Sequence, residues 1–485
     1  MIITHERALL KAQQQLQALQ AFVEQSVSDQ SRIDQVEREL FSQLLALGLT
    51  LLQAFVAAHG DGDAGRQLEA ADGRQLRRLD GLHPRRYLSI FGELQLSRCV
   101  YAEREKQQIE RAPLDEALGL PASEFSYVLQ DWLQRLCVKE SFHEATSDLR
   151  HLLGLAPSNR AAEQMSQRMA QPVEVFALQP AAVPAEEAEL LVATADGKGV
   201  PMRRPLEERV RRGPRREKGE KANKKQMAYV GAVYSIDRFR RTADDVVEEL
   251  DRKQRATQRP VPQHKQVWAE MTRVLEGESC TGRQRLFIEM AIAAHDRDPT
   301  RQKTLVCLMD GEAALWEVAG EWLPRAVGIL DLFHVLERLW NVAHAIHAER
   351  TPAAAQFVEH YLRMLLQGKV GYVIGRFKCL LAEQALRGSR RRVVLAAIRY
   401  YENNRHHMHY DEYLAAGYPI GSGVAEGACR HVVKDRLEQT GMRWTVPGAQ
   451  AILHLRTVYL NGDWNQFIEY YIQTEQDALY GRAAA

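Results

Sequence analysis

The sequence predicts a multidomain α/β protein, on the basis of two contrasting patterns. Apolar runs typical of buried β-strands lead into an acidic residue at 189–197 and at 304–311, and a further strand pattern lies between them at 227–237. The chain before residue 170 and the segment 333–404 instead show mainly helical spacing of apolar residues. We therefore expect a mixed sheet that is interrupted by an all-helical block and preceded by a mainly helical region.

Composition is that of a soluble globular protein, with 45% hydrophobic and 26% charged residues, and the 485-residue length allows about three domains. The net charge of +1 neither favours nor excludes a nucleic-acid partner. Six scattered cysteines form no Cys-x-x-Cys pair, which fits a reducing cytosol and argues against a disulfide framework or zinc knuckle. The N-terminus lacks a signal-peptide layout. The uncharged stretch 40–60 keeps helical spacing around polar interruptions, which favours a buried helix over a membrane span.

Residues 1–60 form the first predicted domain and contain two helices. Leu9, Leu16, Leu19 and Val23 fall at heptad positions a and d. This spacing predicts either a short coiled coil that joins two copies or packing within one chain, and both alternatives stay open. The Gly- and Asp-rich residues 61–75 predict a linker.

The second predicted domain, residues 76–170, begins with a β-hairpin. Apolar residues alternate on both sides of Gly92, which is the pattern of two paired strands. Arg85, Arg86 and Arg98 decorate these strands. We expect them to contact DNA phosphates if this domain binds DNA.

A helix-turn-helix outline follows the hairpin, with helical patterns on either side of residues 154–157. Its second helix would present Asn159, Arg160 and Gln164 to a major groove. Many helical hairpins share this outline without touching DNA, so the pattern alone leaves both interpretations open.

A basic segment between residues 203 and 225 carries eleven Lys or Arg against four Glu. Such a cluster in a near-neutral protein indicates contact with a polyanion, because each neutralised phosphate releases counterions. The alternative is a solvated loop. The candidate DNA contacts in this segment are Arg211, Arg212, Arg215, Arg216, Lys224 and Lys225.

Three acidic residues stand where a metal-dependent nuclease would need them. Asp196 and Asp310 each follow an apolar strand run and precede a glycine, while Glu426 opens a helical stretch after the turn 418–423. Two strand-end carboxylates and a helical one can together hold a pair of Mg²⁺ ions, and such a pair supports phosphodiester cleavage. Taken singly, an Asp-Gly is more often a turn, and a Glu in a helix's first turn is favoured by the helix dipole.

The context of Glu426 adds to its interest. Arg430 and Lys434 follow at i+4 and i+8, on the same face of an expected α-helix. One acid followed by two cations suits a scissile phosphate and its flanking strand. The alternative is a helix that is stabilised by a Glu426–Arg430 pair, worth only a few tenths of a kcal/mol.

Four motifs together resemble bacterial insertion-sequence transposases of the ISKra type, in the DDE superfamily. They are Asp-Gly-Lys-Gly (196–199), Met-Asp-Gly (309–311), Ile-Leu-Asp-Leu-Phe-His (329–334) and the run from Gly417 through Arg436, which continues to Gly-Met-Arg-Trp (441–444). The resemblance covers most of the chain. It implies an RNase H-like core in two parts, 188–332 and 406–485, around an all-helical insertion at 333–405.

The resemblance also assigns roles within the core. It implies that Asp196, Asp310 and Glu426 are the catalytic triad and bind two Mg²⁺ or Mn²⁺ ions. Asp331 and His334 match an Asp-x-x-His element near the site, although a helix-start Asp and a packed His would look the same. Some relatives carry a Cys-rich element after the hairpin. Here only Cys99 occupies that region, so we expect no zinc.

We therefore expect a cytoplasmic, nucleoid-associated transposase that binds terminal inverted repeats, cuts them and joins them to target DNA. It would act as a homodimer or higher oligomer and would not contact membranes. The alternatives are a stand-alone RNase H-like nuclease or resolvase, a catalytically inactive DNA-binding regulator, and a glycosidase with paired carboxylates. The last would be indifferent to Mg²⁺.

Overall fold

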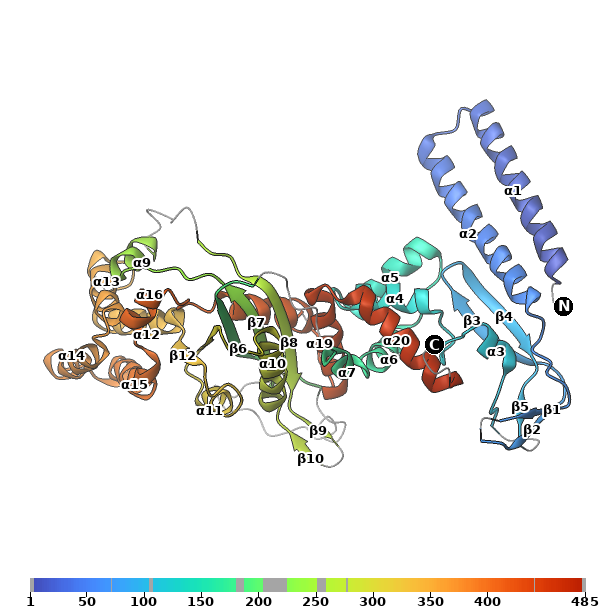
Figure 1. Cartoon of the computed structure of the whole chain (residues 1–485). Coiled ribbons are helices and arrows are strands. Elements are labelled where there is room, and N and C mark those ends of the chain that lie inside the picture. Colours follow the sequence, from blue (N-terminus) through green and yellow to red (C-terminus); the bar gives the residue numbers. More distant parts are fainter. Residues whose placement is uncertain are drawn as a thin grey trace, which may run out of the picture. The chain divides into compact units, whose positions relative to one another are not determined.

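The structure is a computed structural model that describes residues 4–70, 72–103, 108–179, 187–203, 225–250, 259–275, 278–439 and 441–481. The chain divides into two compact units (Figure 1). The first combines Met1–Pro172 with Trp464–Ala485, and the second is Val173–Asp463. The last helix therefore belongs with the N-terminal unit, whereas the sequence prediction had placed it with the core.

The first unit opens with a helical hairpin, α1 (His5–Ser28) and α2 (Ile33–Ala58) (Figure 1). The side chain of Thr4 caps α1 by accepting the N–H of Arg7. Two small sheets follow. The strands are β1 (Gln67–Glu69), β2 (Gln75–Arg78) and β5 (Tyr101–Ala102) in one antiparallel sheet, and β3 (His83–Ser89) and β4 (Gly92–Arg98) in the other. The hairpin predicted around Gly92 is confirmed, but the predicted linker contains β1.

Short helices complete the first unit: α3 (Pro113–Ala117), α4 (Tyr127–Cys137), α5 (Phe142–Leu153), α6 (Asn159–Met169) and α20 (Trp464–Tyr480). A capping box between Ser141 and Glu144 starts α5, and Gly154 ends it at a positive φ of 71°. Ser158 caps α6. The helical pair predicted from the sequence is therefore present. The indole N–H of Trp464 donates to Asp131 at 2.6 Å, which attaches α20 to α4.

The second unit contains a five-stranded mixed sheet. Its strands are β6 (Leu190–Pro201), β7 (Lys225–Ile236), β8 (Gln263–Met271), β11 (Thr304–Met309) and β12 (Val327–Leu330). Their spatial order is β12-β11-β6-β7-β8. The strands β6, β7 and β8 pair antiparallel, while β11 is parallel to both β6 and β12. Asp196 thus lies in the first strand of this sheet in chain order, and Asp310 directly follows the fourth.

The sequence pattern of residues 264–294 also predicts a helical segment, and the structure shows that this prediction is partly wrong. This part of the chain forms β8, then a small hairpin of β9 (Arg273–Leu275) and β10 (Glu278–Cys280), and becomes helical only in α10 (Gly282–Arg297). In β8 every residue from Val267 to Met271 is buried. A short apolar run that is buried on both faces lacks the alternation that marks a strand, so periodicity could not separate it from a helix.

Helices cover both faces of the sheet. One face packs on α10 and α11 (Ala313–Trp322), and the other continues into a helical block whose core includes Val335, Leu339 and Phe377. The block consists of α12 (Leu332–Ile346), α13 (Pro352–Leu366), α14 (Val370–Glu383) and α15 (Gly388–Asn404). The helical segment predicted between the second and third acids is therefore confirmed. Smaller elements are α7 (Val173–Ala177), α9 (Ala243–Leu250), a 3₁₀ turn (Arg405–His407) and α16 (Tyr410–Ala416).

The chain after α16 returns to the sheet. It forms α17 (Gly423–Ala428), a π-helical turn (Cys429–Lys434), α18 (Asp435–Leu437) and α19 (Val446–Asn461). Helix α19 packs along β8 and is buried over most of its length. The motif residue Trp444 lies beside the end of β6, where its backbone N–H donates to the carbonyl of Pro201 at 3.0 Å. The buried guanidinium of Arg436 lies over its indole ring, 5.0 Å from the centroid.

Candidate active site

Asp196 and Asp310 lie side by side on neighbouring parallel strands. Strand pairing sets Ala195 opposite Met309, and each aspartate is the next residue along its strand. Asp310 directly follows β11, as predicted. Asp196 does not end its strand, however, because β6 continues to Pro201 and Asp196 pairs with Val230 of β7.

Burial and neighbouring charges disfavour the ionised form of Asp310. Burial is the largest cause that raises its pKa above the ordinary value of 3.8, and the nearby carboxylate of Asp196 raises it further. The N–H of Glu312, which donates to Asp310 at 3.0 Å, acts in the opposite direction. The site therefore concentrates negative charge that a cation would neutralise.

Glu312 is a fourth acid of this group, which the sequence analysis did not identify. Burial raises its pKa first, followed by the charge of Asp310. A Cβ placed on Gly197 would lie 3.6 Å from a carboxylate oxygen of Glu312, so this side chain reaches back over β6. Its position two residues after Asp310 was the available signal, but only the turn after β11 determines where the side chain points.

Asp331 and His334 form a tight pair at the start of α12. Asp331 is fully buried, and its two carboxylate oxygens have separate partners. One oxygen accepts the N–H of Ser422 at 2.8 Å, and the other lies 2.6 Å from Nδ1 of His334. The hydrogen bond to Asp331 is the main cause that raises the pKa of His334 to about 9. The imidazole is therefore protonated at neutral pH and places a positive charge beside the acids.

Glu426 approaches this pair from α17. Asp331, His334 and Glu426 each offer one potential ligand atom, and the three atoms lie within 4.8 Å of one another. One turn after Glu426, the buried thiol of Cys429 lies against Asp196. Burial raises the pKa of that thiol, and the Asp196 carboxylate raises it further. The start of this helical segment thus lies over β6. Glu426 is close to Asp331 and His334, and His334 in turn senses the charges of Asp310 and Asp196.

Arg430 and Lys434 are exposed, but the spacing assumed for them is wrong. Residues 429–434 form a π-helical turn, so the 3.6-residue period that would align them with Glu426 is broken. Nε of Arg430 lies 3.8 Å from Asp435. Among the residues that the structure describes, neither cation forms an ion pair with the three acids, and a role in binding the flanking DNA strand stays a prediction.

The donor set suits a hard divalent cation. Asp196, Asp310, Glu312 and Glu426 supply only carboxylate oxygens, which Mg²⁺ and Mn²⁺ prefer. Burial is the main cause of the raised pKa values of Asp310 and Glu312, and the neighbouring carboxylates add to it. Thiolate ligation is disfavoured, because the one cysteine here, Cys429, is held in its protonated form.

The hairpin arginines differ in their availability for DNA. The side chains of Arg85 and Arg98 are only 15% and 12% exposed, and both guanidinium groups pair with the buried carboxylate of Asp115. Arg86 is more exposed and pairs with Glu93 and Glu124. Arg86 is therefore exposed enough to contact a phosphate, whereas Arg85 and Arg98 form ion pairs within the first unit.

The helix-turn-helix candidates lie partly on the surface. Arg160, Gln164 and Arg168 are exposed and follow one another at intervals of four on α6. Asn159 is also exposed, but its side-chain oxygen accepts the hydroxyl of Thr146 at 2.7 Å. Three polar side chains thus form one solvent-facing stripe on the second helix.

Most of the predicted basic segment lies outside the described residues. This applies to Arg211, Arg212, Arg215, Arg216 and Lys224. Lys225 is described, and its ammonium group lies 2.5 Å from a carboxylate oxygen of Glu438. The expectation of a phosphate contact therefore stays a prediction for this segment.

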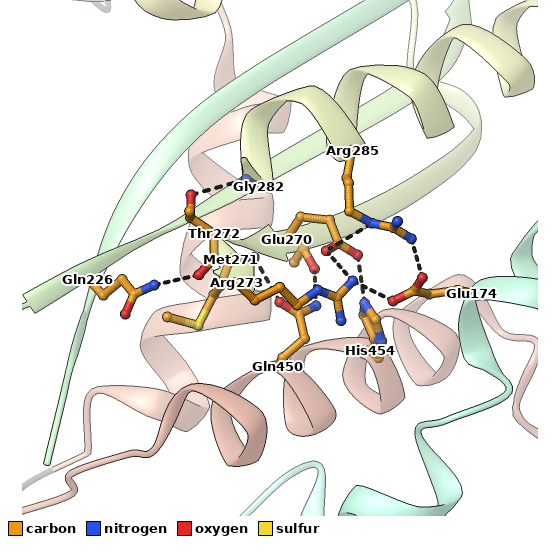
Figure 2. Close-up of polar contacts among 11 residues, drawn as sticks. Glu174, Gln226, Glu270, Met271, Thr272, Arg273, Gly282, Arg285, Gln450 and His454 are labelled. Carbon is orange, nitrogen blue, oxygen red and sulfur yellow. Dashed lines mark hydrogen bonds and ion pairs between the residues drawn. The ribbon is translucent and has the colours of Figure 1, made fainter. Parts of the chain in front are cut away.

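A second charged cluster lies between β8, α10, α19 and α7 (Figure 2). Glu270 is almost fully buried, and its carboxylate contacts Nε2 of His454 at 2.6 Å and a guanidinium nitrogen of Arg273 at 3.1 Å. Glu174 of α7 pairs with both Arg273 and Arg285. Although Glu174, Glu270 and His454 are close enough to share an ion, two guanidinium groups already neutralise the carboxylates. We interpret this cluster as an ion-pair network that fixes α7 and α19 to β8.

Comparison with known proteins identifies no relative: neither a protein-family model nor a curated protein matches the chain. The chemistry of the site is therefore inferred from its geometry and from the sequence motifs that build it. Among the described residues, one helix is long and apolar enough to cross a membrane by length and composition, namely α2.

Proposed function

We propose that this protein is the transposase of a bacterial insertion sequence, which cuts the ends of its element and joins them to target DNA. The observation that carries the proposal is that Asp196 and Asp310 come from neighbouring strands, while Glu426 comes from a helix that packs on β6 and lies beside Asp331 and His334. The three carboxylates come from two adjacent strands and one helix, and such a set could hold the pair of metal ions that supports phosphodiester chemistry. Binding of two Mg²⁺ or Mn²⁺ ions is part of the proposal.

The chain order around these acids supports an RNase H-like core. Three antiparallel strands are followed by two parallel ones, and a helical block separates the second acid from the third. Both features agree with the arrangement that the motif resemblance implies. The proposed nuclease centre would therefore be assembled only after the chain has passed through the helical block and returned at α17.

The residues divide into ligands and positioning groups. Asp196, Asp310 and Glu426 would hold the metal ions, which activate the attacking oxygen and stabilise the leaving one. Asp331 orients His334 through a 2.6 Å contact and fixes the turn before α17 through Ser422. The protonated ring of His334 can attract the scissile phosphate.

DNA recognition is assigned to the first unit together with the basic segment 203–225 of the second. The exposed Arg160 and Gln164 on α6 would reach base edges, and Arg86 and the basic segment 203–225 would contact phosphates. Cutting two ends together requires at least two active sites, so we infer a dimer or larger assembly. The proposed setting is the bacterial cytoplasm, at the nucleoid.

The test is strand cleavage and joining on duplexes that carry the terminal sequences flanking the gene, with Mg²⁺, Mn²⁺ or EDTA. Wild type is compared with Glu426→Gln and with Glu412→Gln, a matched change at an exposed site on α16. We expect cleavage and joining by wild type and Glu412→Gln, and binding without cleavage by Glu426→Gln. Cleavage without joining would identify a nuclease instead. Activity in EDTA would contradict the metal-dependent chemistry.

A further inference from the structure

The hairpin of α1 and α2 exposes many of its large apolar side chains and buries mainly small ones. Its buried contact uses mainly small residues, among them Ala8, Ala12, Thr50 and Ala54. The larger apolar side chains instead face solvent, with exposures between 40% and 81%. They are Leu9, Leu16, Val23 and Val27 on α1, and Ile33, Phe41, Leu44, Leu51 and Phe55 on α2; we refer to these residues as the apolar hairpin face.

These residues fall on one side of each helix, and on α2 the ring of Phe91 lies against Gly48 within the stripe. At 3.6 residues per turn, the four on α1 fall within about 40° of one another, and the five on α2 within about 80°. Viewed along each helix from its N-terminus, the exposed apolar residues are rotated in the same direction away from the buried residues that face the other helix. Because α1 and α2 run antiparallel (Figure 1), that rotation brings both stripes to the same side of the hairpin. The heptad pattern is therefore divided: Leu19 packs within the chain, while Leu9, Leu16 and Val23 point outward.

We propose that the apolar hairpin face binds the same face of a second copy of this chain, forming an antiparallel four-helix bundle. A lone apolar surface of this kind marks an interaction site, and a self-complementary face is what a two-fold dimer needs. A hairpin of 24-residue helices is roughly 36 Å long and about 20 Å wide, so it offers roughly 700 Å² per chain. That is close to the ~800 Å² per partner of a stable interface.

A lipid bilayer is the competing occupant, since α2 is apolar enough for one. However, α2 is not free on its other side. Leu49, Leu52 and Val56 pack on Leu94, Leu96 and Leu120, which belong to β4 and to the segment after α3. A helix fixed along the β3–β4 hairpin cannot be surrounded by lipid, so a protein partner fits this face better.

The inference does not depend on nuclease chemistry, although a dimer would bring together the two sites that end joining requires. The test is the mass of the full chain in solution, measured by sedimentation across micromolar concentrations. We expect twice the 55.2 kDa chain mass for wild type. The double variant Leu16→Glu/Leu51→Glu should become monomeric, with at least a 100-fold weaker association.

Leu10→Glu is the matched control. Leu10 is 56% exposed on α1, but at 3.6 residues per turn it points about 100° away from Leu9. We expect this variant to stay dimeric. Circular dichroism checks that the double variant keeps its helices, and the wild-type mass does not depend on that outcome. A monomeric wild type, a dimer that survives the double change, equal disruption by Leu10→Glu, or flotation of wild type with phosphatidylcholine and phosphatidylglycerol vesicles would each overturn the proposal.

Discussion

His334 Nδ1 lies 2.6 Å from a carboxylate oxygen of Asp331, which is fully buried at the start of α12. The second oxygen of Asp331 accepts the N–H of Ser422, four residues before Glu426. One carboxylate therefore sets both the ring of His334 and the turn that leads to the third acid. Loss of its charge should affect the site from two directions.

We expect Asp331→Asn to lower DNA cleavage by about 10–100-fold, the usual cost of losing a partner that orients ligand groups. The amide would also no longer hold the pKa of His334 near 9. Cleavage by the variant should therefore fall as pH rises through the ordinary histidine range near 6.5, where wild type keeps a protonated ring. Rates measured from pH 6 to 9 test this, with filter binding as a control for retained DNA affinity. Parallel pH profiles would contradict a charge role for His334.

Asp310→Asn should stabilise the metal-free protein. The pKa of Asp310 in the folded state is raised above 3.8. At a pH above the folded and the unfolded pKa values, ionisation of Asp310 therefore lowers the free energy of unfolding. This cost disappears at a pH below the pKa of the unfolded state. The gain at neutral pH should fall in the range of about 0.5–2 kcal/mol that stabilising substitutions commonly give. Calorimetry without divalent ions at pH 7 and at pH 3 tests the sign, because only the pH 7 scan should shift.

The same variant should lose its response to metal. A ligand that binds only the folded state raises stability with its concentration, so Mg²⁺ should raise the wild-type melting temperature and leave Asp310→Asn nearly unchanged. Glu317→Gln, on the neighbouring helix α11, is the matched control that should respond like wild type. An equal Mg²⁺ response in all three proteins would place metal binding elsewhere.

Glu270 stabilises the second unit through its charge. Although burial opposes it, contact with His454 and the two arginines leaves its pKa below 4.5. The ionised form therefore stabilises the fold above the unfolded pKa, and that stability is lost as pH falls through the folded one. We expect Glu270→Ala to cost about 3–5 kcal/mol at pH 7, because it leaves buried cations without their partner. Urea unfolding at pH 7 and at pH 3.5 should show the loss shrinking under acid.

Glu289→Gln provides the opposite control for that prediction. Burial and the charge of Glu270 raise the pKa of Glu289 well above 4.5, so its ionisation opposes folding at neutral pH. Neutralising it should increase stability at pH 7. If both substitutions destabilise equally, the charge network does not account for the stability of this region.

Local pattern predicted the elements that carry the candidate site but not the partners that complete it. The acids at 196, 310 and 426 follow strand runs or a glycine turn, so short-range periodicity was enough to select them. Glu312 was not predicted to belong to the site, because the turn after β11 determines where its side chain points. The network around Glu270 joins residues from 174 to 454, and such long-range contacts have no periodic signature.

Surface position was the least predictable property. Arg85 and Arg98 alternate along a hairpin as exposed residues do, yet both turn toward Asp115, whose position depends on how α3 packs. Conversely, Leu152 follows the buried Leu149 at the i+3 spacing that predicts a packed helix face, yet it is 57% exposed. In both cases tertiary packing decides which face of a strand or helix is covered.

The exposed stripe on α6 should account for part of the salt dependence of DNA binding. Each phosphate contact contributes about 0.9 to the slope of log K against log salt, so Arg168→Ala should lower the slope by about 1 and weaken binding on all sequences alike. Arg160→Ala should also relax sequence preference if Arg160 reads a base edge.

Arg85→Ala is the internal comparison. Because its guanidinium is engaged with Asp115, this variant should lower stability and leave the salt slope unchanged. Fluorescence anisotropy between 50 and 300 mM salt measures all three. A slope that changes for Arg85→Ala but not for Arg168→Ala would move the DNA-binding surface from α6 to the β3–β4 hairpin.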